Sequence, residues 1–244
     1  MRFIKRDSLG EASEIGISQS MPERTHRKPS PPKSAAAPVR AGRPTREQAR
    51  ARQEALLDCA LGHFLEKGFE AATIEAIAAD VNMTKRTVYA RYTDKSALFR
   101  AAIQRGTERL AATPEVIAAT RADGLEETLV NIAELRIALV STPEGTKLQR
   151  LINTESYRFP DIFQTYYDIA ALPTVQFLAG ILENETAAGR LAIDDPLLAA
   201  NVFMSMVVSG PVRFILSGND PGREDIDRRV RFAVRLFLKG AEPR

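Results

Sequence analysis

Residues 85 to 92 (KRTVYARY) surround one apolar residue, Val88, with side chains that carry hydrogen-bond donors or flat rings. Guanidinium and ammonium groups bind phosphate oxygens, and arginine also donates paired hydrogen bonds to base edges. Hydroxyl groups add shorter polar contacts to the same acceptors. Such side chains gain little from burial, so the segment is suited to contact an anionic partner. Its polar and aromatic members are Lys85, Arg86, Thr87, Tyr89, Arg91 and Tyr92.

The alternative is an ordinary surface helix whose charges face water, and the flanking sequence helps to decide between the two. Upstream, Thr73 is placed to cap a helix, and Glu75 in its first turn suits the positive end of the helix dipole. Apolar residues at positions i, i+3, i+4 and i+7 then form one helix face. They are Ile74, Ile77, Ala78 and Val81.

A tight turn separates this helix from the polar segment. Asn82 stands where a left-handed residue is expected, and asparagine tolerates positive φ better than most non-glycine residues. Thr84 can cap the polar helix over residues 85–92, and Asp94 can cap a third helix whose apolar face begins at Leu98. Two short capped helices across a tight turn predict a helix-turn-helix, whose second helix enters the major groove of DNA.

A longer helix is expected from about Thr45 to Lys67, where it would brace the helix-turn-helix. Gly68 follows it and supplies the left-handed residue that commonly ends a helix. The apolar stripe of this helix would face inward, because its members recur at helical spacing. They are Leu57, Ala60, Leu61 and Phe64.

A set of residues in this region also carries a resemblance to a known family. It consists of Gly68, Phe69, Thr73, Ile77, Ala78, Thr84, Thr87, Val88, Tyr89, Tyr92, Lys95, Leu98 and Phe99. Through them the segment 43–103 resembles the DNA-binding domain of the TetR (tetracycline repressor) family of bacterial transcriptional regulators. Two positions depart from the family pattern: Asn82 replaces the usual turn glycine, and Ala90 with Arg91 replaces the more usual aromatic or histidine pair. The second departure bears on which DNA sequence is bound.

The resemblance implies a role for each residue that matches a contact position of the family. Separate groups of side chains would contact the base edges, the phosphates and the adjacent minor groove. By role these are Lys85, Arg86 and Thr87 for base edges; Thr73, Tyr89 and Lys95 for phosphates; Arg43 for the minor groove; and Thr84 and Tyr92 as further DNA-binding residues.

The charge of the chain is divided unevenly along its 244 residues. Residues 1–52 hold 12 Lys and Arg against 5 Asp and Glu, whereas residues 106–244 hold 15 against 19. Such a split suits a basic arm that meets phosphate and a body that does not. Residues 1–40 are rich in Pro, Ser, Ala and Arg without hydrophobic periodicity, which predicts a disordered arm. A solubilising tail is the alternative for its first part, and Met21 is an alternative translation start.

Helical signals continue beyond the helix-turn-helix, and strand patterns are absent. The predicted fold is therefore all-α: the arm at 1–40, a three-helix helix-turn-helix DNA-binding domain at 41–103, and a larger helical domain for effector binding and dimerisation at 104–244. Asp123 and Glu126 are spaced as a capping box. Pro143 is placed at a first helical position, and Pro160 is expected to interrupt the next segment.

The middle helices carry an apolar face and a concentration of aromatic residues, most of which must be core. A short match at Glu155, Arg158, Phe159 and Pro160 resembles the ligand-domain pattern of one TetR subgroup. In the family, effectors enter a cavity among these helices, so the resemblance implies a pocket wall here. The candidate pocket residues are Leu129, Ile132, Tyr157, Phe163, Tyr166, Tyr167 and Phe177.

The last two helices are expected at Pro196 to Leu216 and Arg223 to Lys239, with Pro211 kinking or breaking the first. Their apolar faces exceed what one small domain must cover. The resemblance implies a symmetric homodimer with a four-helix interface, and intramolecular packing is the alternative. The candidate interface residues are Met204, Val207, Val208, Ile226, Val230, Ala233, Val234 and Phe237.

An enzyme is not expected, because the chain offers two histidines, one cysteine, no Gly-x-Ser-x-Gly motif and no phosphate-binding glycine loop. Cys59 is interpreted as an inert residue of the first helix, with a redox-sensing thiol as the alternative. His63 lies near no other histidine in sequence, so no metal site is predicted, and no cofactor.

These observations favour a sequence-specific DNA-binding transcriptional regulator, most simply a repressor released from double-stranded operator DNA by a small-molecule effector. A symmetric dimer would demand a palindromic operator. A cytoplasmic bacterial protein is expected, because no apolar run approaches 18 residues and the N-terminus lacks a secretory pattern. An activator of the same fold and a helical adaptor that ignores DNA are the alternatives.

Overall fold

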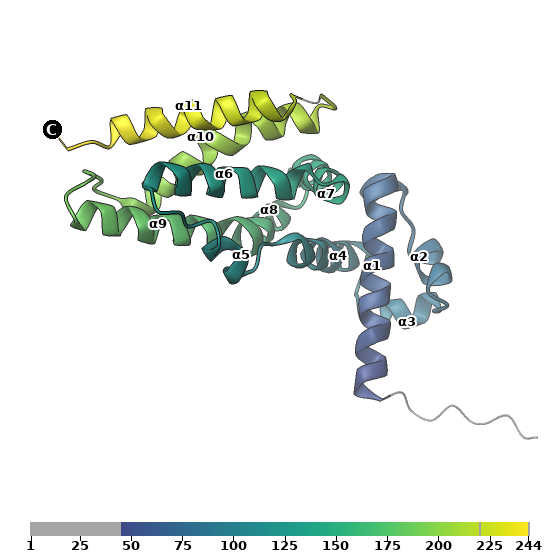
Figure 1. Cartoon of the computed structure of the whole chain (residues 1–244). Coiled ribbons are helices and arrows are strands. Elements are labelled where there is room, and N and C mark those ends of the chain that lie inside the picture. The colour runs from purple at the N-terminus through teal and green to yellow at the C-terminus, as the bar shows by residue number, and fades with distance from the viewer. Residues whose placement is uncertain (1–44, 220, 244) are drawn as a thin grey trace, which may run out of the picture. The chain divides into compact units, whose positions relative to one another are not determined.

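The computed structural model describes residues 45–219 and 221–243, which form helices joined by short connections (Figure 1). No strand occurs among these residues, and the all-α prediction is confirmed. The elements are α1 (Arg46–Ala71), α2 (Ile74–Asp80), α3 (Lys85–Tyr89), α4 (Lys95–Leu110), α5 (Pro114–Ala118), α6 (Leu125–Ser141), α7 (Pro143–Glu155), α8 (Pro160–Tyr166), the π-helix η1 (Tyr167–Ala171), α9 (Leu172–Ala187), α10 (Pro196–Leu216) and α11 (Arg223–Gly240).

α1 begins where the sequence predicts. The Thr45 hydroxyl accepts a hydrogen bond from the Gln48 amide at 3.1 Å, and the Gln48 side chain accepts one from the Thr45 amide at 3.0 Å. This reciprocal capping box satisfies two amides that would otherwise lack partners. Near the other end, Gly68 has a φ of 74°, which confirms the predicted departure from helical backbone at a residue that tolerates it.

The helix-turn-helix has the predicted caps. The side chains of Thr73, Thr84 and Asp94 each accept a hydrogen bond from the backbone amide three residues later, at 3.3, 3.2 and 2.8 Å. In the turn between α2 and α3, Asn82 has a φ of 53°, as expected for a left-handed position. α3 ends at Tyr89, earlier than predicted, because the following residues form a turn rather than another helical turn.

The helix-turn-helix rests on an aromatic core. The rings of Phe64, Phe69 and Phe99 lie 4.9 to 6.2 Å apart, and the ring of Phe159 lies 4.8 Å from that of Phe69. Val88 of α3 is fully buried in the same core. Side chains of α7 and α8 complete it, so the core continues across the boundary predicted at residues 103 and 104. These side chains are Leu148, Leu151, Ile152 and Ile162.

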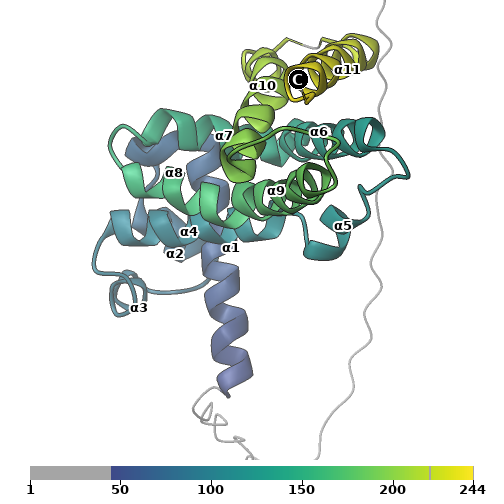
Figure 2. The same cartoon turned by 90° about the vertical axis from the view of Figure 1, so that its left-hand side faces the viewer.

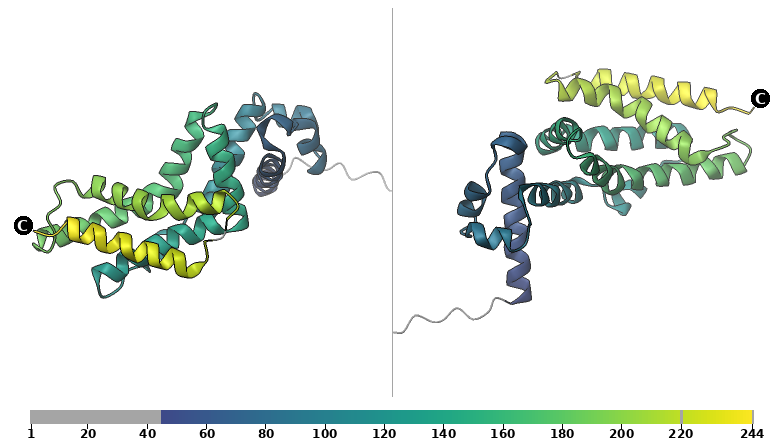
Figure 3. Two further views of the ribbon diagram at one scale, coloured as in Figure 1. Left: turned by 90° about the horizontal axis from the view of Figure 1, so that it is seen from above. Right: turned by 180° about the vertical axis from the view of Figure 1, so that it is seen from behind.

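A second core is enclosed by α6, α9, α10 and α11. Figures 1 and 2 show α6 lying between α11 and α9, and Figure 3 shows α10 and α11 side by side. Ile132, Leu178, Phe203 and Val234 are fully buried in this core. The Phe203 ring lies 5.1 Å from that of Phe237, so the last two helices are joined by an edge-to-face contact.

The helix starts and breaks that the sequence predicts in the C-terminal half are only partly confirmed. Pro143 begins α7 at the first helical position, as predicted. Pro160, which was expected to interrupt a segment, begins α8 at the first helical position. The predicted capping box of α6 is wrong: its N-cap is Gly124, which makes no side-chain bond, and the Thr128 hydroxyl serves this end instead. Pro211 does not break α10, because packing against α6 and α9 keeps the helix continuous where the proline removes a backbone donor.

Candidate nucleic-acid interface

One side chain of α3 is buried in the core, and the others are exposed to solvent. Val88 is fully buried, whereas Lys85, Arg86 and Thr87 are exposed. The Thr87 hydroxyl lies 2.9 Å from the hydroxyl of the capping Thr84, so the two threonines form one polar edge at the start of the helix. The structure therefore brings together the three residues predicted to contact bases, on the side of α3 that faces away from the core.

Lys85 and Arg86 differ in what they already contact. Lys85 forms an ion pair with Glu75 of α2, and both side chains are more than half exposed. This hydrogen bond raises the pKa of Lys85 and lowers that of Glu75. The Arg86 side chain has no ion-pair or hydrogen-bond partner among residues 45–219 and 221–243. Its guanidinium is therefore free to donate paired hydrogen bonds to a phosphate or a base edge.

The predicted phosphate-contacting residues are placed less uniformly. Tyr89 is 43% exposed at the end of α3, and Thr73 is exposed although its hydroxyl already caps α2. The Tyr92 hydroxyl is buried without a hydrogen-bond partner in the described part of the chain, so it is not presented to solvent. The predicted minor-groove residue, Arg43, lies outside the described residues.

Lys95 is engaged inside the protein. Its ammonium group donates hydrogen bonds to the carbonyls of Glu70 and Ala72 at 3.0 and 3.1 Å. It also lies 4.5 Å from the centre of the Phe69 ring, a cation–π distance. These contacts hold the end of α1 to the start of α4, a role that the sequence pattern does not reveal.

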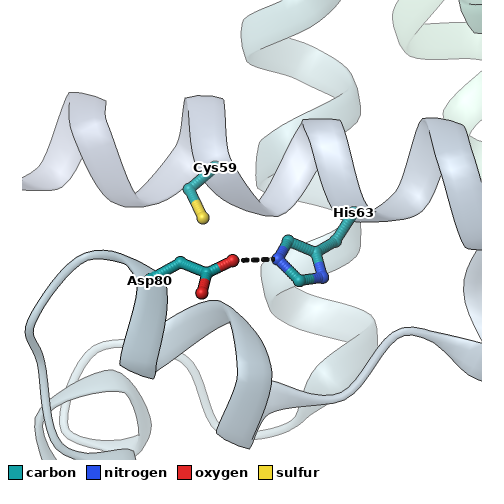
Figure 4. A group of neighbouring side chains, drawn as sticks. All are labelled: Cys59, His63 and Asp80. Carbon is teal, nitrogen blue, oxygen red and sulfur yellow. Dashed lines mark hydrogen bonds and ion pairs between the residues drawn. The ribbon is translucent and has the colours of Figure 1, made fainter. Parts of the chain in front are cut away.

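Cys59, His63 and Asp80 meet where α1 packs against α2, and their donor atoms all lie within 4.8 Å of one another (Figure 4). His63 Nε2 lies 2.7 Å from Asp80 Oδ2, and Lys67 Nζ lies 3.3 Å from His63 Nδ1. Because lysine can only donate, Nδ1 accepts and Nε2 carries the proton that faces Asp80. Sequence spacing placed Cys59 and His63 on one helix but could not show that Asp80 joins them.

This group has the residue types of a metal site but not its surroundings. In a metal-bound histidine, the ring nitrogen that does not bind the metal normally carries a hydrogen and donates it to a carboxylate or a carbonyl. Here the ammonium group of Lys67 faces His63 Nδ1 instead. Burial raises the pKa of the Cys59 thiol, and the Asp80 carboxylate raises it further. The arrangement therefore suits a protonated thiol beside a histidine–aspartate contact that ties α2 to α1.

The structure does not gather the seven candidate pocket residues around one cavity. Leu129 and Ile132 are fully buried in the second core, and Phe177 packs against that core. Tyr157 is 95% exposed and Phe163 is 49% exposed, so neither forms an enclosed wall. Aromatic residues concentrated in sequence are thus distributed between core and solvent, because successive turns of the helices carry them to different faces.

Tyr166 is the candidate that lines a cavity. This cavity holds about 20 Å³, and an adjacent open hollow of about 390 Å³ has Val140, Gln149 and Tyr166 in common with its lining. We call the two the inner and outer parts of the cavity. Arg136 lines the inner part. Sequence reasoning missed Arg136, although one arginine within the apolar run of α6 (NIAELRIALV) was a signal that could have found it. Tyr167 instead donates a hydrogen bond to Asn201 at 2.7 Å.

The candidate interface residues lie mostly within the subunit. Four of the eight are buried in the second core, and the other four pack against it. The reason is that α10 and α11 are apolar on more than one face, so periodicity alone does not tell the inward face from the outward one. The buried four are Val207, Val230, Ala233 and Val234; the partly buried four are Met204, Val208, Ile226 and Phe237.

A different set of apolar side chains from α10 and α11 is exposed. Leu198, Val202 and Met206 recur on one face of α10 and, with Leu236 of α11, line a shallow hollow of about 500 Å³. Among the described helices, α10 is the one long and apolar enough to cross a membrane, and 22% of its most apolar stretch is buried within the subunit. The expectation that no apolar run approaches 18 residues was wrong for α10. Most of the few polar residues of this helix are small, so they interrupt the apolar run without making the helix polar overall.

Two family models match the chain. The model of the tetR family of bacterial regulatory proteins matches residues 56–102, which span most of α1 through α4. The model of the C-terminal domain of AefR-like transcriptional repressors matches residues 127–240, from α6 to the end of α11. The two matches therefore cover the helix-turn-helix and the second core separately.

Individual relatives give the same result. An HTH-type transcriptional repressor of Mycobacterium tuberculosis is 25% identical over 177 residues, which are 71% of this chain and 87% of that protein. The solved structure of the flavonoid-responsive regulator FrrA is 32% identical, covers 80% of this chain and 99% of its own, and has a TM-score of 0.64. A TetR-family regulator structure from Mesorhizobium loti is 25% identical over 82% of this chain and 100% of its own, with a TM-score of 0.67. The chain therefore belongs to the TetR family of transcriptional regulators.

Proposed function

We propose that this protein is a repressor that binds a palindromic operator as a homodimer and is released when a small-molecule effector binds. The observation that carries the DNA-binding part is the exposed N-terminal edge of α3, where the Arg86 side chain has no partner among the described residues. In this proposal residues 41–103 bind DNA, and residues 104–244 bind the effector and dimerise.

Base contacts would come from the first turn of α3. Arg86 would donate paired hydrogen bonds to a base edge, and Thr87 would add a shorter polar contact. Lys85 would exchange Glu75 for DNA, at little cost because the ion pair is solvent-exposed. Thr73, Thr84 and Tyr89 surround this edge as candidate phosphate contacts, with Arg43 as the candidate for the minor groove.

The exposed apolar face of α10 and α11 supports the homodimer. A second copy would cover Leu198, Val202, Met206 and Leu236, which otherwise remain in contact with water. A twofold axis through this face would set two copies of α3 about one DNA turn apart, which requires a palindromic operator. A protein partner on this face accounts for the composition of α10 without a membrane, so we place the protein in the cytoplasm.

The cavity that contains Arg136 is the candidate effector site. Its lining includes Thr107 and Leu110 from the last turn of α4, the helix that follows α3 along the chain. A molecule that occupies this cavity would favour a different position of α4 and so a different spacing of the two recognition helices. FrrA, whose name states that it responds to flavonoids, is matched over 99% of its own length and supports an effector-responsive mechanism.

The test is selection of bound sequences from a random double-stranded DNA library at near-physiological salt. The wild-type protein is expected to enrich a palindrome with half-sites about one helical turn apart. Arg86→Ala should lose the motif, whereas the matched control Arg121→Ala, an exposed arginine outside α3, should retain it. Failure of a folded wild-type dimer to enrich any motif would contradict the proposal and favour the adaptor.

A further inference from the structure

Arg136 is the one charged side chain that is buried among the described residues, with 5% of its surface exposed. It lies on α6, and its guanidinium donates hydrogen bonds to the Ala170 carbonyl at 2.6 Å and to the Tyr166 hydroxyl at 3.2 Å. Both acceptors are neutral. No carboxylate of residues 45–219 or 221–243 lies within 4.0 Å of this guanidinium, so its positive charge has no counter-charge there.

A buried arginine without an anion is costly, because the guanidinium stays charged at any pH that the folded protein meets. Proteins normally pair such a group with a carboxylate or a phosphate. We propose that the counter-charge of Arg136 is supplied by the effector, and that the effector is an organic acid with a carboxylate group and an apolar body. This inference rests on the proposed effector function and names the chemical class that the cavity accepts.

The shape of the cavity agrees with a charged head and an apolar body. Its inner part, next to Arg136, has about 20 Å³, which is room for a small polar group rather than for a whole ligand. Its outer part has about 390 Å³ and lies between α7 and α10. Val140, Val208, Val212 and Leu216 line this outer part with apolar surface. A carboxylate at Arg136 would thus extend its body toward α10.

Two further polar groups converge on the inner part of the cavity. Gln149 is buried and lines both parts, with its side-chain nitrogen donating to Asn153 at 3.1 Å. Tyr166 also lines both parts and can turn its hydroxyl from the arginine toward a ligand oxygen. Ala170, the backbone partner of Arg136, lies in the π-helix η1, and such single π-turns frequently occur at functional sites.

A carboxylate would compete directly with the contacts that Arg136 makes in this structure. Bidentate pairing would draw the guanidinium from the Ala170 carbonyl and the Tyr166 hydroxyl, which belong to η1 and α8. α8 and η1 both contact α4, the helix that follows the helix-turn-helix. A carboxylate that changes the contacts of α8 and η1 can therefore also change the position of α4. An anion is therefore placed to act on DNA binding as well as to bind.

The first measurement is direct binding to the DNA-free full-length protein by calorimetry. Octanoate, octanamide and 1-octanol share one apolar tail and differ in the head group, so they isolate the charge. Octanoate is expected to bind about 10- to 100-fold more tightly than the two neutral compounds. Equal or weaker binding of octanoate, including no binding, would overturn the proposal, and benzoate against benzamide repeats the comparison with an aromatic body.

Variants then assign the preference to one side chain. Arg136→Gln should remove the preference for octanoate, and Arg136→Lys should restore part of it because the charge remains without the planar pair of donors. Arg213→Gln is the matched control, since Arg213 lines the outer part of the same cavity. A preference that survives in Arg136→Gln and disappears in Arg213→Gln would overturn the assignment.

Folding of the variants can be checked independently. Arg136→Met replaces the buried charge with an apolar side chain of similar length, so the ligand-free protein should keep or raise its melting temperature. If it unfolds, Arg136 is a structural residue and the proposal is wrong. If octanoate binds through Arg136 but leaves operator binding unchanged, the anion site is correct and the proposed release by an effector is wrong. If octanamide or 1-octanol releases DNA from the wild-type protein as well as octanoate does, release is correct and the anionic class of effector is wrong.

Discussion

The helix-turn-helix region and the C-terminal helices differ in where their charged and apolar side chains lie. Around α1 to α4 the core is apolar and aromatic, and the cations that have no partner, such as Arg86, lie on the surface. Around α6 to α11 a cation, Arg136, is buried, and apolar side chains such as Val202 and Leu236 are exposed. The first region has no buried charged side chain among the described residues and presents cations such as Arg86 to solvent. The second has an unmatched interior charge and an uncovered face, which points to a ligand and to a partner.

The largest effect should come from the core that both regions share. Phe159 is 5% exposed, and its ring lies 4.8 Å from that of Phe69. Phe159→Ala should lower the free energy of unfolding by about 3 to 5 kcal/mol, since it removes a buried ring and leaves a cavity. Tyr157→Ala, two residues away but 95% exposed, should be nearly neutral in the same denaturant titration. Similar losses in the two variants would show that the regions do not share this core.

Two carboxylates introduced on the exposed face of α10 and α11 should have the next largest effect. The double variant Val202→Asp, Leu236→Asp should weaken dimerisation by about 100-fold or more, because it places two carboxylates at an apolar contact. Analytical ultracentrifugation across a concentration series would measure it. Val116→Asp introduces the same charge at another exposed apolar residue, on α5, and should leave the dimer intact. A dimer unaffected by the double variant would place the interface elsewhere.

A third comparison separates the two kinds of cation within the helix-turn-helix region. Arg86→Ala should weaken operator binding by about 1 to 3 kcal/mol without changing thermal stability, because Arg86 has no partner in the described protein. Lys95→Ala should instead lower stability by about 1 kcal/mol, since it removes the donor to the Glu70 and Ala72 carbonyls. Melting curves measured beside DNA titrations distinguish the two. Unchanged stability in Lys95→Ala would return Lys95 to the role of a simple phosphate contact.

The smallest effect concerns the thiol between α1 and α2. Because burial and the Asp80 carboxylate raise the pKa of Cys59, less thiolate is present at pH 8 than in free cysteine, and alkylation should be slower. Asp80→Asn removes the second cause and should speed alkylation by about threefold at that pH. Iodoacetamide labelling followed by mass spectrometry measures the rate, with denatured protein as the control. A wild-type thiol that reacts as fast as free cysteine would contradict the assignment.

Local sequence signals predicted the first region better than the second. Caps such as Thr84 and Asp94 and the left-handed Asn82 depend on a few neighbouring residues, so they could be recognised without a tertiary structure. The burial of Arg136 depends on α7, α8 and η1 packing around α6, which no local pattern encodes. The choice between the two apolar faces of α10 depends likewise on which helices it meets. Lys95 shows the limit within the first region, because its backbone acceptors lie more than 20 residues away.

The core that joins α1 and α4 to α7 and α8 has a consequence for protein engineering. Leu148, Ile152 and Ile162 are numbered with the C-terminal half, but they pack among the aromatic rings beneath the recognition helix. A chimeric regulator cut at residue 103 would place foreign side chains against one half of this core. Exchange of operator specificity between relatives should therefore succeed more often by replacing the exposed residues of α3, or by carrying α7 and α8 along with α1 to α4.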